Sequence, residues 1–452
     1  MDERDKGVSV HRRSFLALSA TSLLGPRVPW QFPANRPVPS PEQLAWHRDE
    51  LAFFLHFGVN TFTDREWGDG KEDPAIFNPA GLDARQWART AKDAGFKLLI
   101  LTAKHHDGFC LWPSALTTHS VASSPWREGG GDLVREFTDA CRAEGLKAGI
   151  YLSPWDRHEL SYGDSPRYND FYIAQLTELL TRYGPITEVW FDGANGEGPN
   201  GKRQVYDWPR FHRTVRELQP GALMFSDAGP DIRWIGNEKG TAGDPNWCMM
   251  DPAAVPYAGA DGPNIINALQ HGDPSGTVWR PGEADVSIRP GWFYHPAEDA
   301  QVRSPDNLMD LYRSSVGRNA GLLLNVPPNR DGLLSPADVG NLGAFGRKLR
   351  DLYQNASTPH GPSDGLTLDL LSPVSFDHVS IQEDIGAGQR IARHVVDVWN
   401  GSTWRPLTEG TTIGYKRLYR FPSVSSSMVR LRIVESYGEP NILRMQVMNS
   451  LA

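Results

Sequence analysis

The sequence has few cysteines and, beyond its first few dozen residues, no long apolar run. Its three cysteines, Cys110, Cys141 and Cys248, lie far apart and form no CxxC pair. Neither a disulfide framework nor a zinc ribbon is therefore indicated, and we expect three buried thiols. No later segment offers the roughly 20 consecutive apolar residues that a membrane-spanning helix needs, so we expect no membrane partner.

Basic charge is also scarce. The formal net charge is -8, which excludes the broad basic surface that a nucleic-acid partner requires. No GxGxxG or GxxxxGK[ST] motif follows a predicted strand, so a nucleotide-binding sheet has no support and we expect no cofactor. Tryptophan is abundant, at 15 residues. Flat indole faces suit stacking against sugar rings, although many of them will fill the core.

The N-terminus carries a targeting pattern. Arg12 and Arg13 precede a short apolar run that ends near Leu24, which predicts a twin-arginine export signal. The alternative is a chance arginine pair ahead of a disordered tail. We predict a signal and disordered segment over residues 1–34, with cleavage near Ala34, and a periplasmic or secreted location. A protein exported already folded needs no disulfides, which agrees with the few cysteines.

Short apolar runs alternate with amphipathic stretches through the following 300 or so residues. Helices are predicted over residues 83–94 and 133–144, each closed by a glycine. Continuous apolar runs are typical of parallel strands covered on both faces, and they occur at residues 52–59, 96–102, 147–152, 187–191 and 222–226. Repeated strand–helix units predict an α/β fold, with a (β/α)8-like TIM barrel favoured over an open sheet, in a catalytic domain over residues 35–357.

The amino-acid composition changes to Asn, Ser, Thr, Pro and Gly near residues 355–363. Beyond it the pattern is β throughout, with a turn signal at Asn400-Gly401, and strands are predicted at residues 366–371, 376–383, 392–398 and 428–434. We therefore predict a small β-sandwich over residues 358–452. A structural role is favoured over carbohydrate binding, since Trp399 and Trp404 suit packing as well as an aromatic platform.

Polar and titratable residues follow the predicted strands at the same end. His56 lies toward the end of the first, His105 and His106 follow the second, Tyr151 lies at the end of the third and Asp192 follows the fourth. Barrel enzymes place their catalytic groups at these carboxyl ends. Asp192 is therefore a candidate catalytic carboxylate, and the alternative is that it caps the N-terminus of a helix.

Five segments in this order resemble the motifs of family 29 of the glycoside hydrolases, the α-L-fucosidases. They are HFG (56–58), KHHDGF (104–109), SPWDR (153–157), WFDG (190–193) and LLLNVPPN (322–329). The resemblance covers roughly residues 45–350 and extends weakly into the β region. It implies a retaining, exo-acting α-L-fucosidase working by double displacement on a fucosylated oligosaccharide or glycoconjugate, without a metal or other cofactor.

The resemblance also assigns the two catalytic carboxyl groups. Asp192 is the nucleophile. Glu238 lies on a segment resembling the acid/base region of the subgroup that acts on α-1,3/1,4 linkages of branched, Lewis-type glycans. Such an acid needs a raised pKa, and we expect Trp234 and Trp247 to give it an apolar surround. Two further glutamates compete for the role, Glu197 and Glu283.

The remaining site residues would bind the sugar. Trp292 resembles the aromatic residue beside the C6 methyl of fucose, where an apolar wall selects for a 6-deoxy sugar. A purely structural role is also open for Tyr151. The predicted substrate-binding set is His56, Glu66, Trp67, His105, His106, Tyr151 and Trp292.

Other classes remain alternatives. The chain could be a broad-specificity α-L-fucosidase of the other subgroup, an exo-glycosidase for another sugar, or a non-catalytic fucose-binding protein on the same scaffold. A metal-dependent hydrolase would use the three histidines with Asp192 as ligands. That class is disfavoured, because adjacent histidines rarely bind one metal together and the sequence has no HxH or HExxH spacing.

Overall fold

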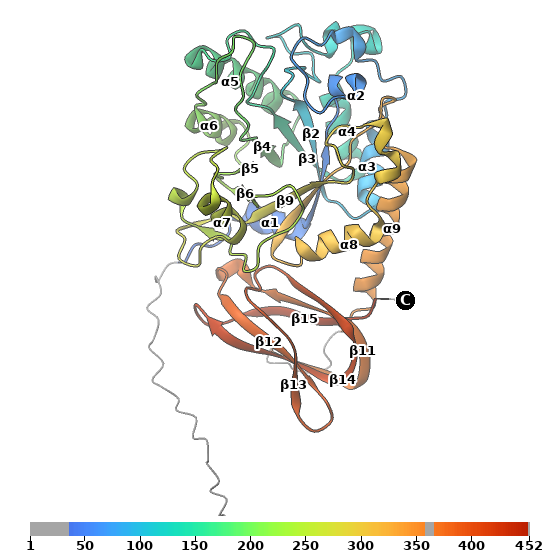
Figure 1. The fold of residues 1–452 in the computed structure, drawn as a ribbon, viewed down its shortest axis with the longest axis vertical. Coiled ribbons are helices and arrows are strands. Elements are labelled where there is room, and N and C mark those ends of the chain that lie inside the picture. Colours follow the sequence, from blue (N-terminus) through green and yellow to red (C-terminus); the bar gives the residue numbers. More distant parts are fainter. Residues whose placement is uncertain (1–35, 358–365, 451–452) are drawn as a thin grey trace, which may run out of the picture. The chain divides into compact units, whose positions relative to one another are not determined.

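Eight parallel strands close into a barrel, which confirms the predicted architecture (Figure 1). The computed structural model describes residues 36–357 and 366–450. Around the barrel the order is β1-β10-β9-β6-β5-β4-β3-β2. The strands span β1 Leu51–Leu55, β2 Leu98–Lys104, β3 Lys147–Leu152, β4 Glu188–Trp190, β5 Leu223–Ser226, β6 Ile232–Trp234, β9 Gly282–Ser287 and β10 Ala320–Asn325.

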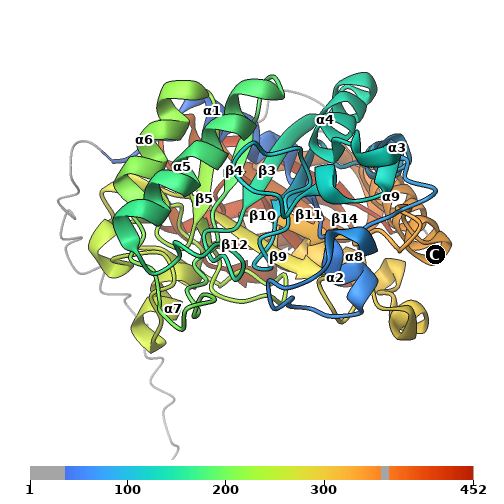
Figure 2. The same ribbon diagram turned by 90° about the horizontal axis from the view of Figure 1, so that it is seen from above.

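Helices cover the outside of these strands, as α3 to α6 do when the barrel is seen from above (Figure 2). The described helices are α1 Pro41–Asp49, α2 Val59–Thr63, α3 Ala84–Asp93, α4 Leu133–Glu144, α5 Ser165–Arg182, α6 Trp208–Leu218, α7 Pro263–His271, α8 Pro305–Ser314 and α9 Pro336–Gln354. No helix separates β5 from β6. A long excursion over residues 235–281 instead follows β6 and carries α7 with the small pair β7 Met249–Met250 and β8 Val278–Trp279.

The sequence signals for α3 and α4 are confirmed at both ends. The side chains of Asp83 and Asp132 accept hydrogen bonds from backbone N–H groups in the first turns, at 2.9 and 3.0 Å. Gly95 and Gly145 follow the helices with φ of 99° and 71°. Glycine tolerates this left-handed conformation, so it ends each helix and leads the chain into the next strand.

The C-terminal part is an antiparallel sheet of five strands in the order β13-β12-β14-β11-β15. Its strands are β11 Thr367–Glu383, β12 Ile391–Trp399, β13 Trp404–Gly410, β14 Arg417–Ser436 and β15 Ile442–Met448. Two runs predicted as separate strands form the single strand β11, whose pairing with β14 shifts register twice. The Asn400-Gly401 turn joins β12 to β13 as predicted. Two strands, β13 and β15, were missed.

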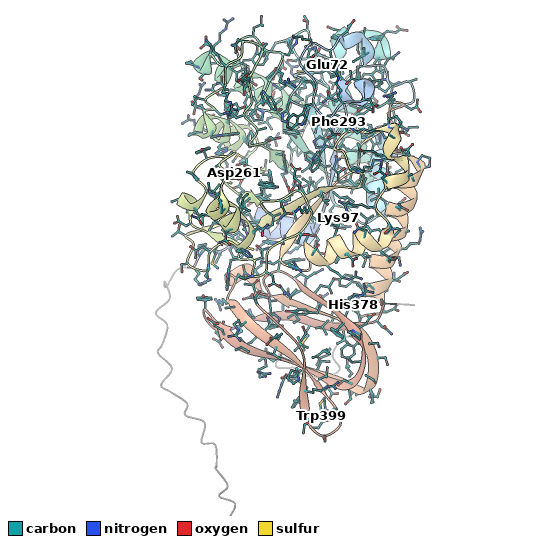
Figure 3. All side chains as sticks on the ribbon, viewed as in Figure 1. Glu72, Lys97, Asp261, Phe293, His378 and Trp399 are labelled. Atoms are coloured by element: carbon teal, nitrogen blue, oxygen red, sulfur yellow. The ribbon has the colours of Figure 1, made fainter. Side chains whose placement is uncertain are left out.

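This sheet contacts the end of the barrel where the strands begin. Lys416 forms an ion pair with Glu50, which directly precedes β1, and Arg417 forms one with Asp244, at 2.5 and 2.6 Å. In Figure 3, Lys97 just before β2 lies toward His378 of the sheet, whereas Phe293 lies toward the other end. The catalytic ends of the strands therefore open away from the sheet.

The structure tests the predictions on the cysteines and on membrane-spanning helices, but not those on the export signal and the domain boundary. The three cysteines are free and buried, as expected. The export signal lies outside the described residues, and so does the predicted domain boundary at residue 358. Both stay predictions. None of the helices in residues 36–357 and 366–450 combines the length and hydropathy needed to cross a membrane.

Two glutamates are enclosed inside the barrel. Glu188 on β4 accepts a hydrogen bond from the indole of Trp46, and Glu283 on β9 accepts one from the indole of Trp190, both at 3.1 Å. Both side chains are buried, and in the described ranges neither forms an ion pair with a basic residue. Burial raises the pKa of Glu188 to about 8, and burial together with the charge of Glu188 raises that of Glu283 well above its usual range. The pair therefore retains a proton at neutral pH.

This retained proton makes stability depend on pH. Because the folded pKa values lie above the unfolded ones, the contribution is complete below about pH 4.5 and is lost as pH rises toward 8. Each retained proton gives a slope of up to about 1.4 kcal/mol per pH unit. We expect Glu283→Gln, a neutral isostere, to flatten the fall in unfolding free energy that urea titrations measure between pH 5 and 8. The exposed control Glu217→Gln should keep the wild-type slope, and an unchanged slope in Glu283→Gln would contradict the assignment.

Candidate active site

A cavity of about 370 Å³ opens at the carboxyl ends of the barrel strands. Phe293, labelled in Figure 3, lies beside it and packs its ring against those of His56 and His105. All the predicted site residues except Tyr151 line the cavity. The full lining is Phe54, His56, Glu66, Trp67, His105, His106, Trp190, Asp192, Ala194, Glu238, Asp285 and Trp292.

Asp192 lies just after β4 with both carboxylate oxygens engaged. Its Oδ2 accepts the hydroxyl of Tyr151 at 2.9 Å, and its Oδ1 accepts the N–H of Ala194 at 2.7 Å. Tyr151 is fully buried, so it contacts the carboxylate without lining the cavity. The helix N-cap alternative is wrong, because residues 193–207 form no helix and α6 starts only at Trp208. The carboxylate is held in place with a quarter of its side chain exposed (25%).

Glu238 reaches the same cavity from the excursion after β6. Although much of its side chain is exposed at the cavity mouth, burial of the carboxyl raises its pKa, and the charges of Asp192 and Glu66 raise it further. A hydrogen bond with Trp292 acts in the opposite direction. The net direction favours a protonated acid. Neither competitor lines the cavity: Glu197 uses its carbonyl to accept the indole of Trp155, and Glu283 is enclosed deeper in the barrel.

The expected aromatic surround of Glu238 was partly wrong. Trp247 packs with Met249, Trp279 and Ile385, away from the cavity. The reason is local: the chain passes behind β9 at Gly240, whose N–H donates to the carbonyl of Asp285, and continues into β7. The indole of Trp234 donates to the Asp285 carboxyl instead. Trp292 takes the expected place beside Glu238.

His56 is held as a neutral ring by Asn325. The amide nitrogen of Asn325 donates to Ser287 Oγ and to the Trp292 carbonyl, so its oxygen must accept from His56 Nδ1, at 2.9 Å. Burial lowers the pKa of His56 to about 3. The other nitrogen, Nε2, is therefore a hydrogen-bond acceptor.

His106 follows the same rule through a different partner. The hydroxyl of Ser153 donates to the carbonyl of Trp155, so it accepts from His106 Nδ1, both at 2.7 Å. Burial lowers the pKa of His106 to about 4, against the opposing effect of Asp192, whose Oδ2 lies 3.8 Å from Nε2. The ring of His105 lies between those of His56 and His106, tilted by 38° against that of His106 at a centroid distance of 4.0 Å and edge-on to that of His56 at 5.5 Å. The cavity thus presents two neutral imidazole acceptors.

Glu66 acts on the loop that carries Trp292. Its carboxylate accepts the backbone N–H groups of Trp292 and Phe293 at 2.9 and 3.1 Å. His295 bridges Glu66 to Asp64, at 2.7 and 2.8 Å. Glu66 therefore lines the cavity as predicted, and the structure adds that it fixes the position of the Trp292 indole.

A buried ion pair supports the side of the cavity that carries Trp67, which we call the Trp67 wall. Lys104 and Asp156 meet at 2.8 Å with side-chain exposures of 0% and 2%. The next residues along the chain hold the loop after Trp67: Arg157 donates to the Gly68 carbonyl, and His158 Nδ1 lies 2.7 Å from the Gly70 carbonyl. The KHHDGF and SPWDR segments thus connect the barrel interior to the Trp67 wall. Among residues 36–357 and 366–450, no group of three or more His, Cys, Asp or Glu side chains has an arrangement that could hold a metal ion.

Known proteins are similar to this chain in sequence and in fold. A family model described as α-L-fucosidase matches residues 43–351. Alpha-L-fucosidase 1 of Arabidopsis thaliana is 44% identical over 444 residues, which cover 90% of this chain and 86% of that protein. The chain belongs to the α-L-fucosidase family.

Solved structures of the family agree. A glycoside hydrolase 29 family member from an unknown rumen bacterium is 41% identical with a TM-score of 0.85, over 92% of this chain and 78% of that one. A Ruminococcus gnavus GH29 fucosidase, solved in complex with fucose, is 33% identical with a TM-score of 0.80, over 93% and 97% of the two chains. The predicted membership among the glycoside hydrolases is thereby confirmed.

Four residues of the candidate site were not predicted from the sequence. Trp190 and Asn325 lie within the WFDG and LLLNVPPN motifs, and Asn325 is a polar residue at a strand end, which is a signal that the sequence offers. Phe54 belongs to an ordinary apolar run. Asp285 had no signal of its own, because a single acidic residue within a strand gives no indication of facing a cavity.

The Arg157 contact gives a test of the Trp67 wall. Arg157→Met keeps the side-chain stem and removes the hydrogen bond to Gly68, so the family's α-L-fucosidase reaction should show KM raised about 3–10-fold, the effect of one hydrogen bond, with little change in kcat. Steady-state kinetics on an aryl α-L-fucoside measure this. The exposed Arg167→Met is the control. A fall in kcat at constant KM would contradict a role in holding the wall.

Proposed function

We propose that the chain is a retaining, exo-acting α-L-fucosidase that removes terminal α-L-fucosyl residues from fucosylated oligosaccharides or glycoconjugates. One observation carries the proposal: a carboxylate fixed by Tyr151 and Ala194 shares one cavity with a second carboxyl whose pKa is raised. A retaining glycosidase needs one ionised and one protonated carboxyl group in this arrangement. The fucose complex of the Ruminococcus gnavus relative supports the choice of sugar.

The reaction proceeds in two displacements. In the first, Asp192 attacks the anomeric carbon while Glu238 gives its proton to the departing glycosidic oxygen, which leaves a fucosyl ester on Asp192. In the second, Glu238 takes a proton from water as that water attacks the same carbon, releasing fucose and restoring both groups. The hydroxyl of Tyr151 keeps Asp192 in place through both steps.

The cavity wall accounts for recognition of the sugar. His56 and His106 each present a neutral Nε2 that accepts a hydrogen bond from a sugar hydroxyl. Apolar faces of Phe54, Trp190 and Trp292 suit a methyl group where other hexoses carry a polar one. Hydroxyl partners beside an apolar wall favour a 6-deoxy sugar.

We also propose a preference for α-1,3/1,4 linkages of branched, Lewis-type glycans. Its support is the resemblance of the segment around Glu238 to that subgroup, together with the position of Glu238 on the cavity wall. The alternatives are a broad-specificity α-L-fucosidase and a non-catalytic fucose-binding protein, which the experiments below distinguish.

The two carboxyl roles are separable by kinetics. Asp192→Ala should lower kcat on the order of 10³-fold or more, since it removes the nucleophile. Glu238→Ala should cost about 10²–10⁴-fold on a substrate with a poor leaving group and much less on an activated aryl fucoside. Azide should rescue the two variants to fucosyl azides of opposite anomeric configuration. Near-wild-type rates for Glu238→Ala on the poor leaving group would refute the acid/base assignment, and no turnover by the wild type would favour a binding protein.

Linkage and stereochemistry need a second measurement. We expect proton NMR of early hydrolysis to show the α anomer of fucose first, because double displacement retains configuration. We also expect kcat/KM for a Lewis-type trisaccharide to exceed that for a linear α-1,2-fucoside at least about tenfold, since each tenfold needs only about 1.4 kcal/mol of selective binding. Equal rates on both would favour the broad-specificity alternative, and a β anomer would contradict retention.

A further inference from the structure

Four acidic residues line the cavity, and Asp285 is the one to which the preceding sections give no role. Every second residue of β9 points into the barrel, since alternate residues of a strand share a face. These inward-facing residues are Glu283, Asp285 and Ser287. Glu283 forms the enclosed pair with Glu188, and Ser287 supports Asn325. Asp285 lies between them and lines the cavity beside Glu238.

The surroundings of Asp285 do not suit a carboxylate. Its residue exposure is 3%, and its Oδ1 accepts one hydrogen bond, from the indole of Trp234 at 2.8 Å. The cavity lining contains four acidic residues but no lysine or arginine. A buried carboxylate without a cation is costly, so a carboxyl group in this position retains its proton. Burial, followed by the charge of Glu238, raises the pKa of Asp285 well above its usual range.

A neutral carboxyl group is a hydrogen-bond donor. With Oδ1 engaged by Trp234, the acid has one O–H to place, and a buried donor needs an acceptor. Two of the polar groups that line the cavity, the Nε2 atoms of His56 and His106, are acceptors for hydroxyl groups. A donor at Asp285 complements these two acceptors, because each sugar hydroxyl can give one hydrogen bond and also accept one.

We propose that Asp285 is a substrate-binding residue that acts as a neutral acid and donates a hydrogen bond to a fucoside oxygen on the Glu238 side of the cavity. The inference rests on the proposed function. A neutral Asp285 also leaves Glu238 free to become negative when it gives up its proton, since no second charge forms beside it. An ionised Asp285 would oppose that step.

Two substitutions with side chains of similar size distinguish the loss of a hydrogen-bond donor from the loss of side-chain volume. Asp285→Asn keeps a neutral donor at the same place, whereas Asp285→Leu fills the site without one. We expect Asp285→Leu to raise both KM for an aryl α-L-fucoside and the inhibition constant of L-fucose about 5–30-fold. Asp285→Asn should stay within about threefold of the wild type, because an amide N–H replaces the acid O–H. Thermal melting checks that each variant is folded, and Asp285→Ala replaces the leucine variant if that one does not fold.

Two results would contradict a neutral, substrate-binding Asp285. If Asp285→Asn binds as weakly as Asp285→Leu, the group acts as a carboxylate and the inference is wrong. If Asp285→Leu matches the wild type, Asp285 does not contact the substrate and the inference is also wrong. Calorimetry with L-fucose keeps this test separate from the proposed reaction, since a wild type that binds fucose without turning over a fucoside disproves the reaction alone.

Discussion

The hydrogen bonds between β1 and β10 close the barrel, and the site depends on that closure. Phe54 on β1 pairs with Asn325 at the end of β10. His56 emerges two residues later, and its ring is held by the same Asn325. Asn325 also holds the carbonyl of Trp292 through its amide nitrogen. One side chain at the closing contact thus fixes both a sugar ligand and the loop that forms the apolar wall.

Closure also explains which parts of the fold were predictable. Parallel strands buried on both faces give continuous apolar runs, so β1 to β5 were visible in sequence. β6 is only three residues long and is followed by the excursion over residues 235–281, so no strand–helix period marks it. In the C-terminal sheet, β13 lacks buried positions to reveal it. Short or half-exposed strands obtain their stability from neighbours that a local pattern does not contain.

The residues of the candidate site also divide into those that the sequence predicted and those that it did not. Asp192 and the histidines follow strands directly, so their direction is set by the barrel and could be read from their place in the chain. Trp247 and Asp285 show where this reasoning fails. Trp247 lies close to Glu238 in sequence, yet the chain turns behind β9 between them. Asp285 lies inside a strand, and its direction is known only once the closed barrel fixes which face of β9 points inward.

The span between the paired elements of the site has a consequence for how the protein is made. Glu66 fixes Trp292 across 226 residues, and Asn325 fixes His56 across 269. Contacts this distant in sequence form late, after the intervening chain has been ordered. On the ribosome, most strands of the barrel emerge while His56 still lacks its partner Asn325. The position of the His56 ring is fixed last, when β10, the final strand of the barrel, emerges and docks.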